Sequence, residues 1–469
     1  MANIKFGTDG WRGVIAEEFT FANARIVAHA IARYVVRGED ARKGVLIGYD
    51  HRFASDTIAA AVAEAISSTG TPVWVTDKPC PTPAISLLVR QRQAAGGILI
   101  TASHNPYQWN GIKYKASYGS SALPSIVAQI ENELETVVKN GVPILPPRKN
   151  LIHSIEPRAP YLDTIEKLID WKKLRDANFR FVVDPMHGSA AGLLQELFTR
   201  NGVSCDEIRA SRDPLFGGVH PEPIDPHINA LREAVVSSHY DAGLAADGDG
   251  DRIGAIDRDG SFVNPHQILA LMVWHLAGTR NLPGDIAKTF SVTKLIDKLA
   301  AKFHRKLHEV PIGFKYICEL MLEQNILIGG EESGGIVTSL YLPERDATVS
   351  ALLLAELMAW HGKSLGELLA VLHAEFGEFH YGRVDLDLKP GQKEKAIAQF
   401  SGDKLSQILE WPVVRRESMD GIKLYLGDIG WVLVRASGTE NLLRVYCETS
   451  RQEFTDRVLK GVTAMVNAL

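Results

Sequence analysis

The sequence has few cysteines and no long apolar run, and both absences narrow the class of protein. Its four cysteines, at positions 80, 205, 318 and 447, form no CxxC pair. This spacing fits neither a disulfide framework nor a thiolate zinc site, and it is typical of a reducing compartment. The longest apolar stretches, near residues 268–274 and 351–360, are interrupted and too short to cross a bilayer. The first twelve residues have no apolar core, so we expect no signal peptide.

Charge and missing motifs exclude further classes. The 51 basic and 56 acidic side chains give a net charge of −5, which argues against a nucleic-acid-binding surface. Apolar residues are 45% and charged residues 23%, as in ordinary globular proteins, so wholesale disorder is excluded. Walker A, HExxH, GxGxxG and GxSxG motifs are absent. We therefore expect a cytoplasmic protein that binds neither nucleic acid nor a membrane.

The order of apolar segments predicts an α/β protein with a different C-terminal part. Short apolar strands alternate with amphipathic helices as far as residue 376, which predicts mixed, mostly parallel sheets. The predicted strands of this part are Val45–Gly48, Thr71–Val75, Gly97–Ile100, Phe179–Val183, Asp241–Ala246, Ile286–Val292 and Ile326–Gly329. The predicted helices include Ile58–Ser67, Ala190–Phe198 and Leu295–Phe303. After Gly377, four short strands and a closing helix, Glu453–Ala468, predict an α+β segment.

These changes of pattern predict four domains. A length of 469 residues suggests about three domains, within one either way. We expect α/β domains at residues 1–152, 153–261 and 262–376, followed by an α+β domain at 377–469.

The clearest chemical signal is an acidic loop after a predicted strand. Asp247, Asp249 and Asp251 alternate with glycine. Two like charges about 4 Å apart near a surface cost on the order of 4 kcal/mol, and a hard divalent cation removes that cost. A solvated acidic turn is the alternative. An EF-hand is excluded, because its sixth and twelfth loop positions, which need glycine and glutamate, hold Arg252 and Arg258.

Other loops at predicted strand ends carry weaker signals. Ser103 and His104 lie in one of them, where Ser103 fits an ordinary loop or N-cap serine as well as a reactive one, and His104 fits a general base or a hydrogen-bonded loop residue. Glu331, in a glycine-flanked loop, fits either sugar hydroxyls or a helix cap. Arg435 heads a hydroxyl-rich loop that suits a phosphate dianion or a plain surface turn.

Taken together, the loops resemble those of the α-D-phosphohexomutase superfamily, which includes phosphoglucomutases, phosphomannomutases and phosphoglucosamine mutases. The motifs that carry the resemblance are TDGWRG at 8–13, TASHNP at 101–106, DGDGDR at 247–252, GEESGG at 330–335 and RASGTEN at 435–441. They occur in the family's order and cover essentially the whole chain. The resemblance implies three similar α/β domains and a C-terminal domain with a TATA-box-binding-protein-like fold, arranged around a central cleft.

The resemblance also implies a role for each matching residue. Ser103 is implied to be the phosphorylated residue, with Arg12, Lys113 and His104 as the other catalytic residues. One Mg²⁺ per chain is implied, held by Asp247, Asp249, Asp251 and a phosphoserine oxygen from Ser103. The implied substrate-binding residues are Arg252 near the reacting phosphate, Gly313 and Lys315 for orientation, Glu331 and Ser333 for the sugar, and Arg435, Ser437, Gly438 and Thr439 for the phosphate that is not transferred.

The implied activity is interconversion of hexose 1-phosphate and hexose 6-phosphate. It proceeds through phosphoserine and a hexose 1,6-bisphosphate, which serves as intermediate and activator. GEESGG shares its first half with the GEESFG of phosphoglucomutases and lacks the last histidine of GEMSGH and GEQSGH, so we expect glucose phosphate first and mannose phosphate second. A phosphomannomutase or phosphoglucosamine mutase is the alternative. We expect a monomer or weak homodimer whose partners are sugar phosphates.

Two other classes fit the same loops less well. A sugar-phosphate hydrolase is expected to lack the last phosphate-binding loop, but Arg435 and Ser437 are present. A non-catalytic sugar-phosphate-binding protein is expected to lack Ser103 or one of the aspartates, and none of these is missing.

Overall fold

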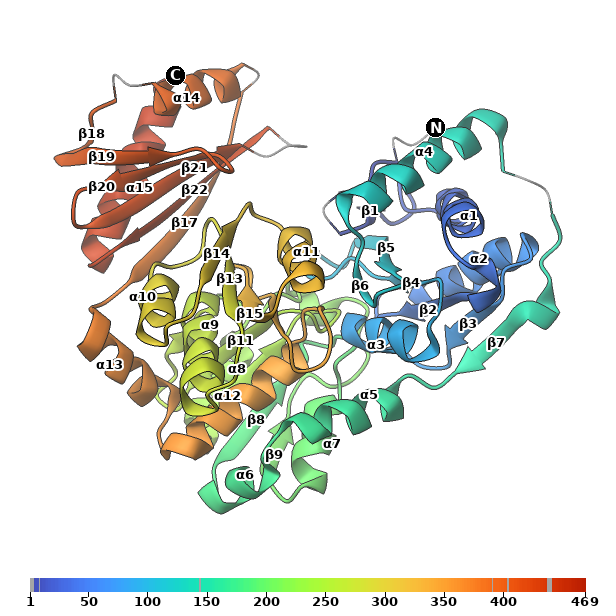
Figure 1. The fold of residues 1–469 in the computed structure, drawn as a ribbon, viewed down its shortest axis with the longest axis horizontal. Helices are drawn as coiled ribbons and strands as arrows, with labels where there is room; N and C mark the ends of the chain where they lie inside the picture. The colour runs from blue at the N-terminus through green and yellow to red at the C-terminus, as the bar shows by residue number, and fades with distance from the viewer. Residues whose placement is uncertain (1–3, 8, 143–144, 390, 403–404, 437–440) are drawn as a thin grey trace. The chain divides into compact units, whose positions relative to one another are not determined.

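The structure is a computed structural model that describes residues 4–7, 9–142, 145–389, 391–402, 405–436 and 441–469. Figure 1 labels its helices and strands, and internal contacts divide the chain into two compact units. The first unit comprises Met1–Ile286 and Gly313–Leu368, and the second comprises Ala287–Ile312 and Leu369–Leu469. Within the described ranges, no helix combines the length and the apolar character needed to cross a membrane.

The first sheet of the first unit is mixed. Its strands are β1 (Trp11–Val14), β2 (Val45–Tyr49), β3 (Val73–Thr76), β4 (Gly96–Ile100), β5 (Trp109–Ala116), β6 (Ser120–Ser121) and β7 (Ile152–Ile155). The order is β1-β5-β4-β2-β3-β7, with β6 paired to β5. Strand β2 runs parallel to β3 and β4, whereas β5 runs antiparallel to β1 and β4. The carboxyl ends of β2 and β4 therefore lie next to each other.

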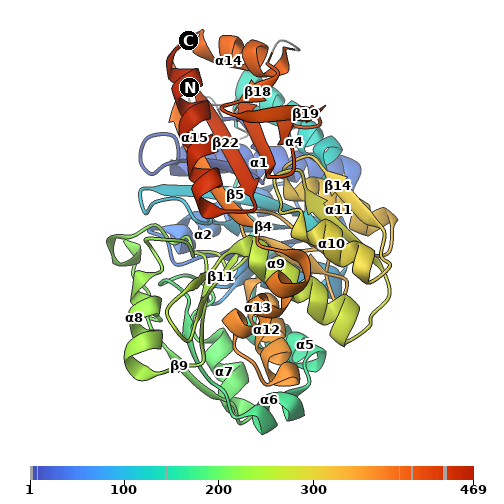
Figure 2. The same cartoon turned by 90° about the vertical axis from the view of Figure 1, so that its left-hand side faces the viewer.

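Helices pack on both faces of this sheet. They are α1 (Phe21–Gly38), α2 (Ser55–Ser68), α3 (Thr82–Arg92) and α4 (Pro124–Asn140), and Figure 2 shows α1 and α4 beside the sheet. Because side chains alternate along a strand, Val45 and Ile47 of β2 enter the core formed with α1, α2 and α4. Gly48 faces α3, where a Cβ would lie 2.6 Å from Ile85. The small residue therefore lets α3 approach the sheet closely.

The second sheet has five strands and carries the acidic loop. Its strands are β8 (Arg180–Asp184), β9 (Ser204–Glu207), β10 (Ala242–Ala246), β11 (Ile253–Asp257) and β12 (Phe262–Val263), in the order β12-β11-β10-β8-β9. The helices of this region are α5 (Arg158–Ile165), α6 (Trp171–Ala177), α7 (Leu193–Arg200) and α8 (Asn229–Ser238). The helix predicted at 190–198 begins at Leu193 instead, because Gly192 is in the left-handed conformation with φ +75°.

The rest of the first unit places the GEESGG loop. Its elements include α9 (Pro265–Val273), α11 (Phe314–Glu323), β15 (Ile326–Gly330), β16 (Ile336–Thr338) and α12 (Ala347–His361). Strands β15 and β16 pair antiparallel, and residues 331–335 form the turn between them. Strand β13 (Asp285–Thr289) and helix α13 (Leu365–Phe376) run from the first unit into the second.

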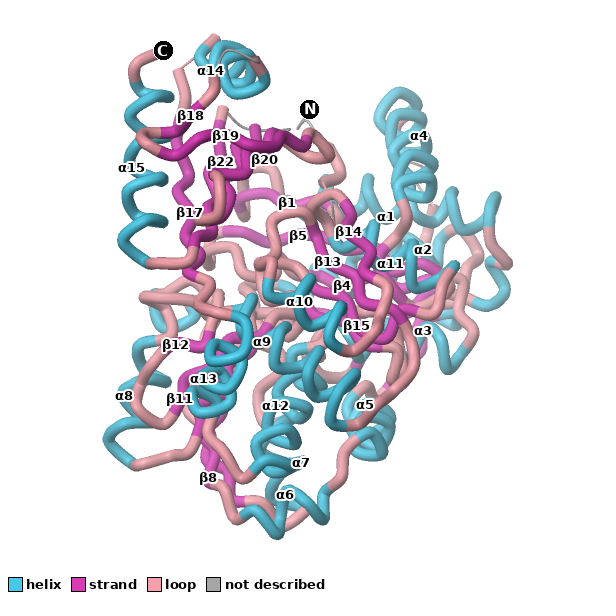
Figure 3. The backbone as a smooth tube through the Cα atoms, turned by 60° about the vertical axis from the view of Figure 1, so that its left-hand side comes forward, coloured by secondary structure: helices cyan, strands magenta, loops and turns pink. Residues whose placement is uncertain are grey.

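The second unit is built on an antiparallel sheet (Figure 3). Its elements are α10 (Leu295–Lys302), β14 (Leu307–Val310), β17 (His380–Asp387), α14 (Gln392–Ser401), β18 (Gln407–Ile408), β19 (Trp411–Glu417), β20 (Ile422–Leu426), β21 (Gly430–Ala436), β22 (Leu442–Thr449) and α15 (Gln452–Asn467). The strand order is β17-β22-β21-β20-β19-β18. Helices α14 and α15 pack on one face, where Phe400 and Val462 meet Val432 and Val445. The predicted fold class, three α/β regions followed by an α+β region, is confirmed.

Candidate active site

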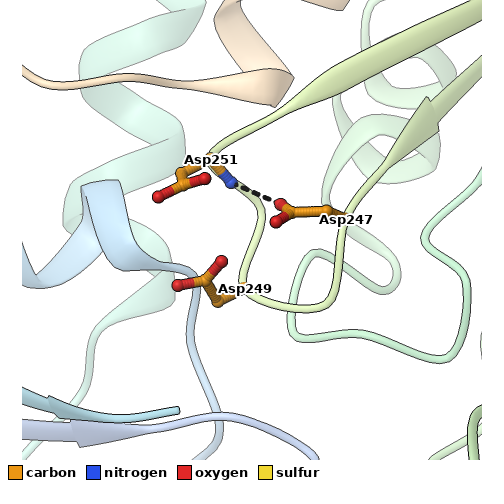
Figure 4. Close-up of side chains that lie close together, drawn as sticks. All are labelled: Asp247, Asp249 and Asp251. Carbon is orange, nitrogen blue, oxygen red and sulfur yellow. Dashed lines mark hydrogen bonds between the residues drawn. The ribbon is translucent and has the colours of Figure 1, made fainter. Parts of the chain in front are cut away.

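The three aspartates of the acidic loop are buried together. Asp247, Asp249 and Asp251 lie in the turn between β10 and β11, and none is exposed to solvent. Each offers a carboxylate oxygen, and these oxygens lie within 4.8 Å of one another. Figure 4 shows the three side chains grouped on one loop, with Asp251 N donating to Asp247 Oδ1 over 2.9 Å. The alternative of a solvated acidic turn is therefore wrong.

The donor set of this loop fits a divalent cation. Among the described residues, neither Asp249 Oδ1 nor Asp251 Oδ1 has a hydrogen-bond partner, although both atoms are buried. A buried carboxylate oxygen without a partner is costly, and a hard cation satisfies it. The three aspartates are the residues that would hold Mg²⁺. Burial, together with the charges of Asp249 and Asp251, raises the pKa of Asp247 well above its usual range.

The TASHNP loop brings Ser103 to the acidic loop. Ser103 Oγ donates to Asp247 Oδ2 over 2.9 Å, and the serine side chain is buried. The approach depends on Gly248, because a Cβ there would lie 2.5 Å from Ser103 O. Ser103 itself has φ +53°, a left-handed conformation that is uncommon for a residue with a side chain. The hydroxyl of Ser103 therefore lies beside the aspartates because Gly248 has no side chain and because Ser103 has a left-handed backbone conformation.

His104 lies next to the hydroxyl as a neutral ring. Its Nδ1 is 3.3 Å from Ser103 Oγ. Burial, followed by the positive charges of Arg252 and Arg12, lowers the pKa of His104 well below its usual range. The lowered pKa keeps the ring neutral and makes it a weak base, so a role as general base stays a prediction.

Lys113 lies among the carboxylates. Its Nζ is 2.7 Å from Asp249 Oδ2, 2.9 Å from Asp251 Oδ2 and 3.1 Å from Asp9 Oδ2. Burial disfavours the ammonium, but these three carboxylates outweigh it and raise the pKa of Lys113. Lys113 is therefore a protonated amine at neutral pH.

Arg345 is a second cation in this cluster, and the sequence motifs did not indicate it. Its Nη2 is 2.7 Å from both Asp9 Oδ2 and Asp251 Oδ2, and its Nη1 is 3.3 Å from Glu331 Oε2. The guanidinium also faces the ring of Phe314 at 4.8 Å. The available signal was the charged triplet 344–346, which directly precedes the apolar helix α12.

Arg12 and Arg252 border the same loops. Arg12 Nη1 donates to Asn105 Oδ1 over 2.5 Å, which ties the N-terminal motif to the TASHNP loop. Arg252 Nε lies 3.9 Å from Asp251 Oδ1. Its backbone forms a bridge with Gly335, so the acidic loop and the GEESGG loop are joined.

The GEESGG loop presents one buried carboxyl group. Burial raises the pKa of Glu331 to about 7, although the charge of Arg345 opposes the shift. The contact with Arg345 shows that this side chain binds a cation and does not cap a helix. Ser333 is half-buried in the same turn. Gly313 is the N-cap of α11 and Lys315 lies in its first turn.

The last motif is described only in part. Arg435 lies in β21, and its Nε donates to Asp420 Oδ1 over 2.8 Å. Ser437, Gly438 and Thr439 lie outside the described residues. Their phosphate-binding role stays a prediction.

Four segments of the chain match the domains of one protein family. The sequence matches the phosphoglucomutase/phosphomannomutase family at alpha/beta/alpha domain I (residues 3–141), domain II (159–260), domain III (264–376) and the C-terminal domain (394–464). It is 29% identical to a phosphoglucomutase/phosphomannomutase of Thermococcus kodakarensis, over 99% of both chains. It is 32% identical to a phosphoglucosamine mutase of Variovorax paradoxus, over 94% of both chains.

A solved structure of similar fold and sequence supports the same family. The crystal structure of a putative phosphomannomutase from Thermus thermophilus has 32% sequence identity and a TM-score of 0.88, covering 99% of each chain. Since four family domains match in order and full-length relatives exceed 30% identity, the chain belongs to the phosphoglucomutase/phosphomannomutase family of the α-D-phosphohexomutase superfamily and is an enzyme of the phosphotransferase mutase type.

Proposed function

We propose that this enzyme interconverts hexose 1-phosphate and hexose 6-phosphate by lending a phosphoryl group from Ser103. The observation that carries the proposal is the 2.9 Å hydrogen bond from Ser103 Oγ to Asp247 Oδ2. Ser103 Oγ lies beside three buried aspartates that suit a divalent cation, which is a placement that an ordinary loop serine does not require. The same position suits a phosphoserine whose charge is offset by a divalent cation and nearby arginines.

In the first half-reaction, the bond between phosphorus and Ser103 Oγ breaks and a bond to a sugar hydroxyl oxygen forms. The sugar hydroxyl loses its proton and Ser103 Oγ gains one, so atoms and charge balance. His104, as a neutral ring, and Lys113, as an ammonium, are the two groups that can accept and donate those protons. When bound at the three aspartates, Mg²⁺ supplies Lewis-acid polarisation of phosphoryl oxygens.

The hexose 1,6-bisphosphate that results must reverse its orientation before the second half-reaction. The bond between the other phosphorus and its sugar oxygen then breaks and a bond to Ser103 Oγ forms, while Ser103 Oγ loses its proton and the sugar oxygen gains one, so the chain returns to its phosphorylated starting state. Arg12 and Arg252 are proposed to hold the reacting phosphate, and Arg435 the phosphate that is not transferred. The residues proposed to hold the sugar in both orientations are Gly313, Lys315, Glu331 and Ser333.

Three sugar phosphates are candidate substrates. The form of the GEESGG loop favours glucose phosphate, with mannose phosphate next. The name of the Variovorax paradoxus relative, phosphoglucosamine mutase, favours glucosamine phosphate at least as well. A second carboxylate beside Glu331, that of Glu332, is compatible with an amino sugar, since a carboxylate attracts an ammonium group.

A coupled assay tests the proposal. Glucose 1-phosphate, mannose 1-phosphate and glucosamine 1-phosphate are each supplied with Mg²⁺ and a trace of the matching hexose 1,6-bisphosphate. We expect turnover of at least one sugar, and near-complete loss of that turnover in Ser103→Ala. Full activity of Ser103→Ala would reject the phosphoserine route, whereas release of inorganic phosphate in place of the isomer would favour a hydrolase.

A further inference from the structure

The segment Tyr49-Asp50-His51-Arg52 has no part in the site described above. It begins at Tyr49, the last residue of β2, and the TASHNP loop follows β4. Because β2 and β4 are parallel neighbours, the segments that leave their carboxyl ends lie side by side. Arg52 is thereby brought under the loop that carries Ser103.

Arg52 holds this loop through its main chain. The side chain is fully buried, and its four hydrogen bonds all go to carbonyl oxygens of residues 103–109. Nη1 donates to Pro106 O and Trp109 O over 2.9 Å each. Nη2 donates to Ser103 O over 2.6 Å and to Asn105 O over 2.7 Å. One planar cation therefore fixes both ends of the loop.

Asp50 contacts both Arg52 and Thr101, the residue that starts the TASHNP loop. Its Oδ2 lies 3.2 Å from Arg52 Nε and accepts a 2.6 Å hydrogen bond from Thr101 Oγ1. Thr101 Oγ1 in turn accepts from Ser103 N over 2.9 Å. The ring of Phe216 covers the guanidinium at 4.8 Å. Ser103 is thus held through its N–H and its carbonyl by one buried ion pair.

Such a support is needed because Ser103 has φ +53°. A residue with a side chain keeps this conformation only where its surroundings impose it. We propose that Arg52 is a positioning residue, which imposes the left-handed conformation on Ser103 and so aims Oγ at Asp247 through every phosphoryl transfer. This inference rests on the proposed function. Lysine cannot replace Arg52, because an ammonium has three donors and no planar fork.

A merely structural arginine would affect stability alone, so kinetics separate the two roles. In Arg52→Lys we expect kcat for hexose phosphate interconversion to fall about 10–100-fold with KM within about threefold, because a small misplacement of a reacting group costs about that much rate. The matched control is Arg280→Lys. Arg280 Nη1 also binds a backbone carbonyl, Leu168 O at 3.1 Å, and a buried carboxylate, Glu356 at 3.3 Å, and we expect native kcat and KM there.

Amide hydrogen exchange gives a second measurement that does not depend on catalytic turnover. In Arg52→Lys, amide hydrogen exchange of residues 103–109 should quicken while the exchange of α1 and α2 stays native, and Arg280→Lys should leave 103–109 unchanged. Native kcat in Arg52→Lys, or faster exchange spread over the whole unit, overturns the positioning role. If the native enzyme converts no hexose phosphate, the proposed function fails. Faster exchange confined to residues 103–109 in Arg52→Lys would then still support Arg52 as the residue that positions Ser103, whereas unchanged exchange of these residues would overturn that positioning role as well.

Discussion

Ser103 and Asp247 are 144 positions apart in the sequence and joined by a hydrogen bond of 2.9 Å between Ser103 Oγ and Asp247 Oδ2. The serine follows β4 of the first sheet, and the aspartate follows β10 of the second. Two loops at the carboxyl ends of strands in different sheets therefore share one buried space. The chemistry of that space depends on the charges that surround it, and each of these charges can be altered singly.

Removing one aspartate charge should weaken cation binding. In Asp247→Asn we expect the dissociation constant for Mg²⁺ to rise at least tenfold, because one of three charged ligands becomes neutral while the loop keeps its shape. Isothermal titration calorimetry measures the change. Asp259→Asn is the control, since Asp259 lies in an exposed turn after β11. An Mg²⁺ affinity equal to that of the native protein would show that the cation binds elsewhere.

Mg²⁺ should stabilise the folded chain. The three aspartates converge only in the folded state, so the cation favours that state by mass action, by about 2.7 kcal/mol at a concentration 100 times its dissociation constant. Thermal unfolding with and without Mg²⁺ checks this. We expect a rise in Tm for the native protein and a smaller rise for Asp247→Asn. Equal rises in the two proteins would contradict a site at these carboxylates.

Glu331 should make stability fall as the pH rises. Burial raises its pKa from an ordinary 4.5 to about 7 in the folded state. Between these values the unfolded chain has lost the proton and the folded chain keeps it, so ionisation on unfolding favours the unfolded state by about 3 kcal/mol in total. The difference in free energy of unfolding between native protein and Glu331→Gln, measured with urea at pH 5 and pH 7, should shift in favour of the variant at pH 7. A constant difference would show that Glu331 is ionised throughout.

Lys423, in the second unit, should make stability rise as the pH rises. Its Nζ donates to Phe290 O over 2.7 Å and lies 4.1 Å from the ring centre of Trp431. Burial, reinforced by the charge of Lys288 and opposed by Glu309, lowers its pKa to about 7. Between pH 7 and pH 9 the Lys423 amine loses its proton in the folded state and keeps it in the unfolded chain. The free energy of unfolding should therefore rise with pH.

The expected rise is about 2 kcal/mol relative to Lys423→Met, which has no charge to lose. Urea unfolding of the two proteins at pH 7 and pH 9 measures it. Lys395→Met, on the exposed side of α14, should follow the native pH dependence. A parallel pH dependence of Lys423→Met and native protein would mean that Lys423 stays charged when buried.

Local pattern was enough to predict the most apolar strands, such as β2, β4 and β10, and the acidic loop, but it did not predict β1, β5 or β11. A strand such as β10 is marked by five consecutive small or apolar residues, and the alternation of aspartate with glycine is a signal within six positions. Lys113 and Ser103 also emerged, because each lies in a short motif of the family. The roles assigned to these residues remain proposals.

Arg345 and Arg52 could not be found in this way. Arg345 binds Asp9, which is 336 positions away, and Arg52 binds carbonyl groups about 50 positions away. A single arginine has no periodicity, and a hydrogen bond to a backbone carbonyl leaves no trace in the partner's side chain. Only the pairing of β2 with β4 reveals that Arg52 lies under the serine.

The most direct test follows phosphate through Ser103. The native protein is incubated with Mg²⁺ and a hexose 1,6-bisphosphate labelled in its phosphates, separated from free sugar, and mapped by mass spectrometry. The account predicts label on Ser103 that unlabelled hexose monophosphate removes, with the label recovered in hexose bisphosphate. Label on any other residue, or a native enzyme that interconverts hexose phosphates while Ser103 never carries phosphate, would contradict it.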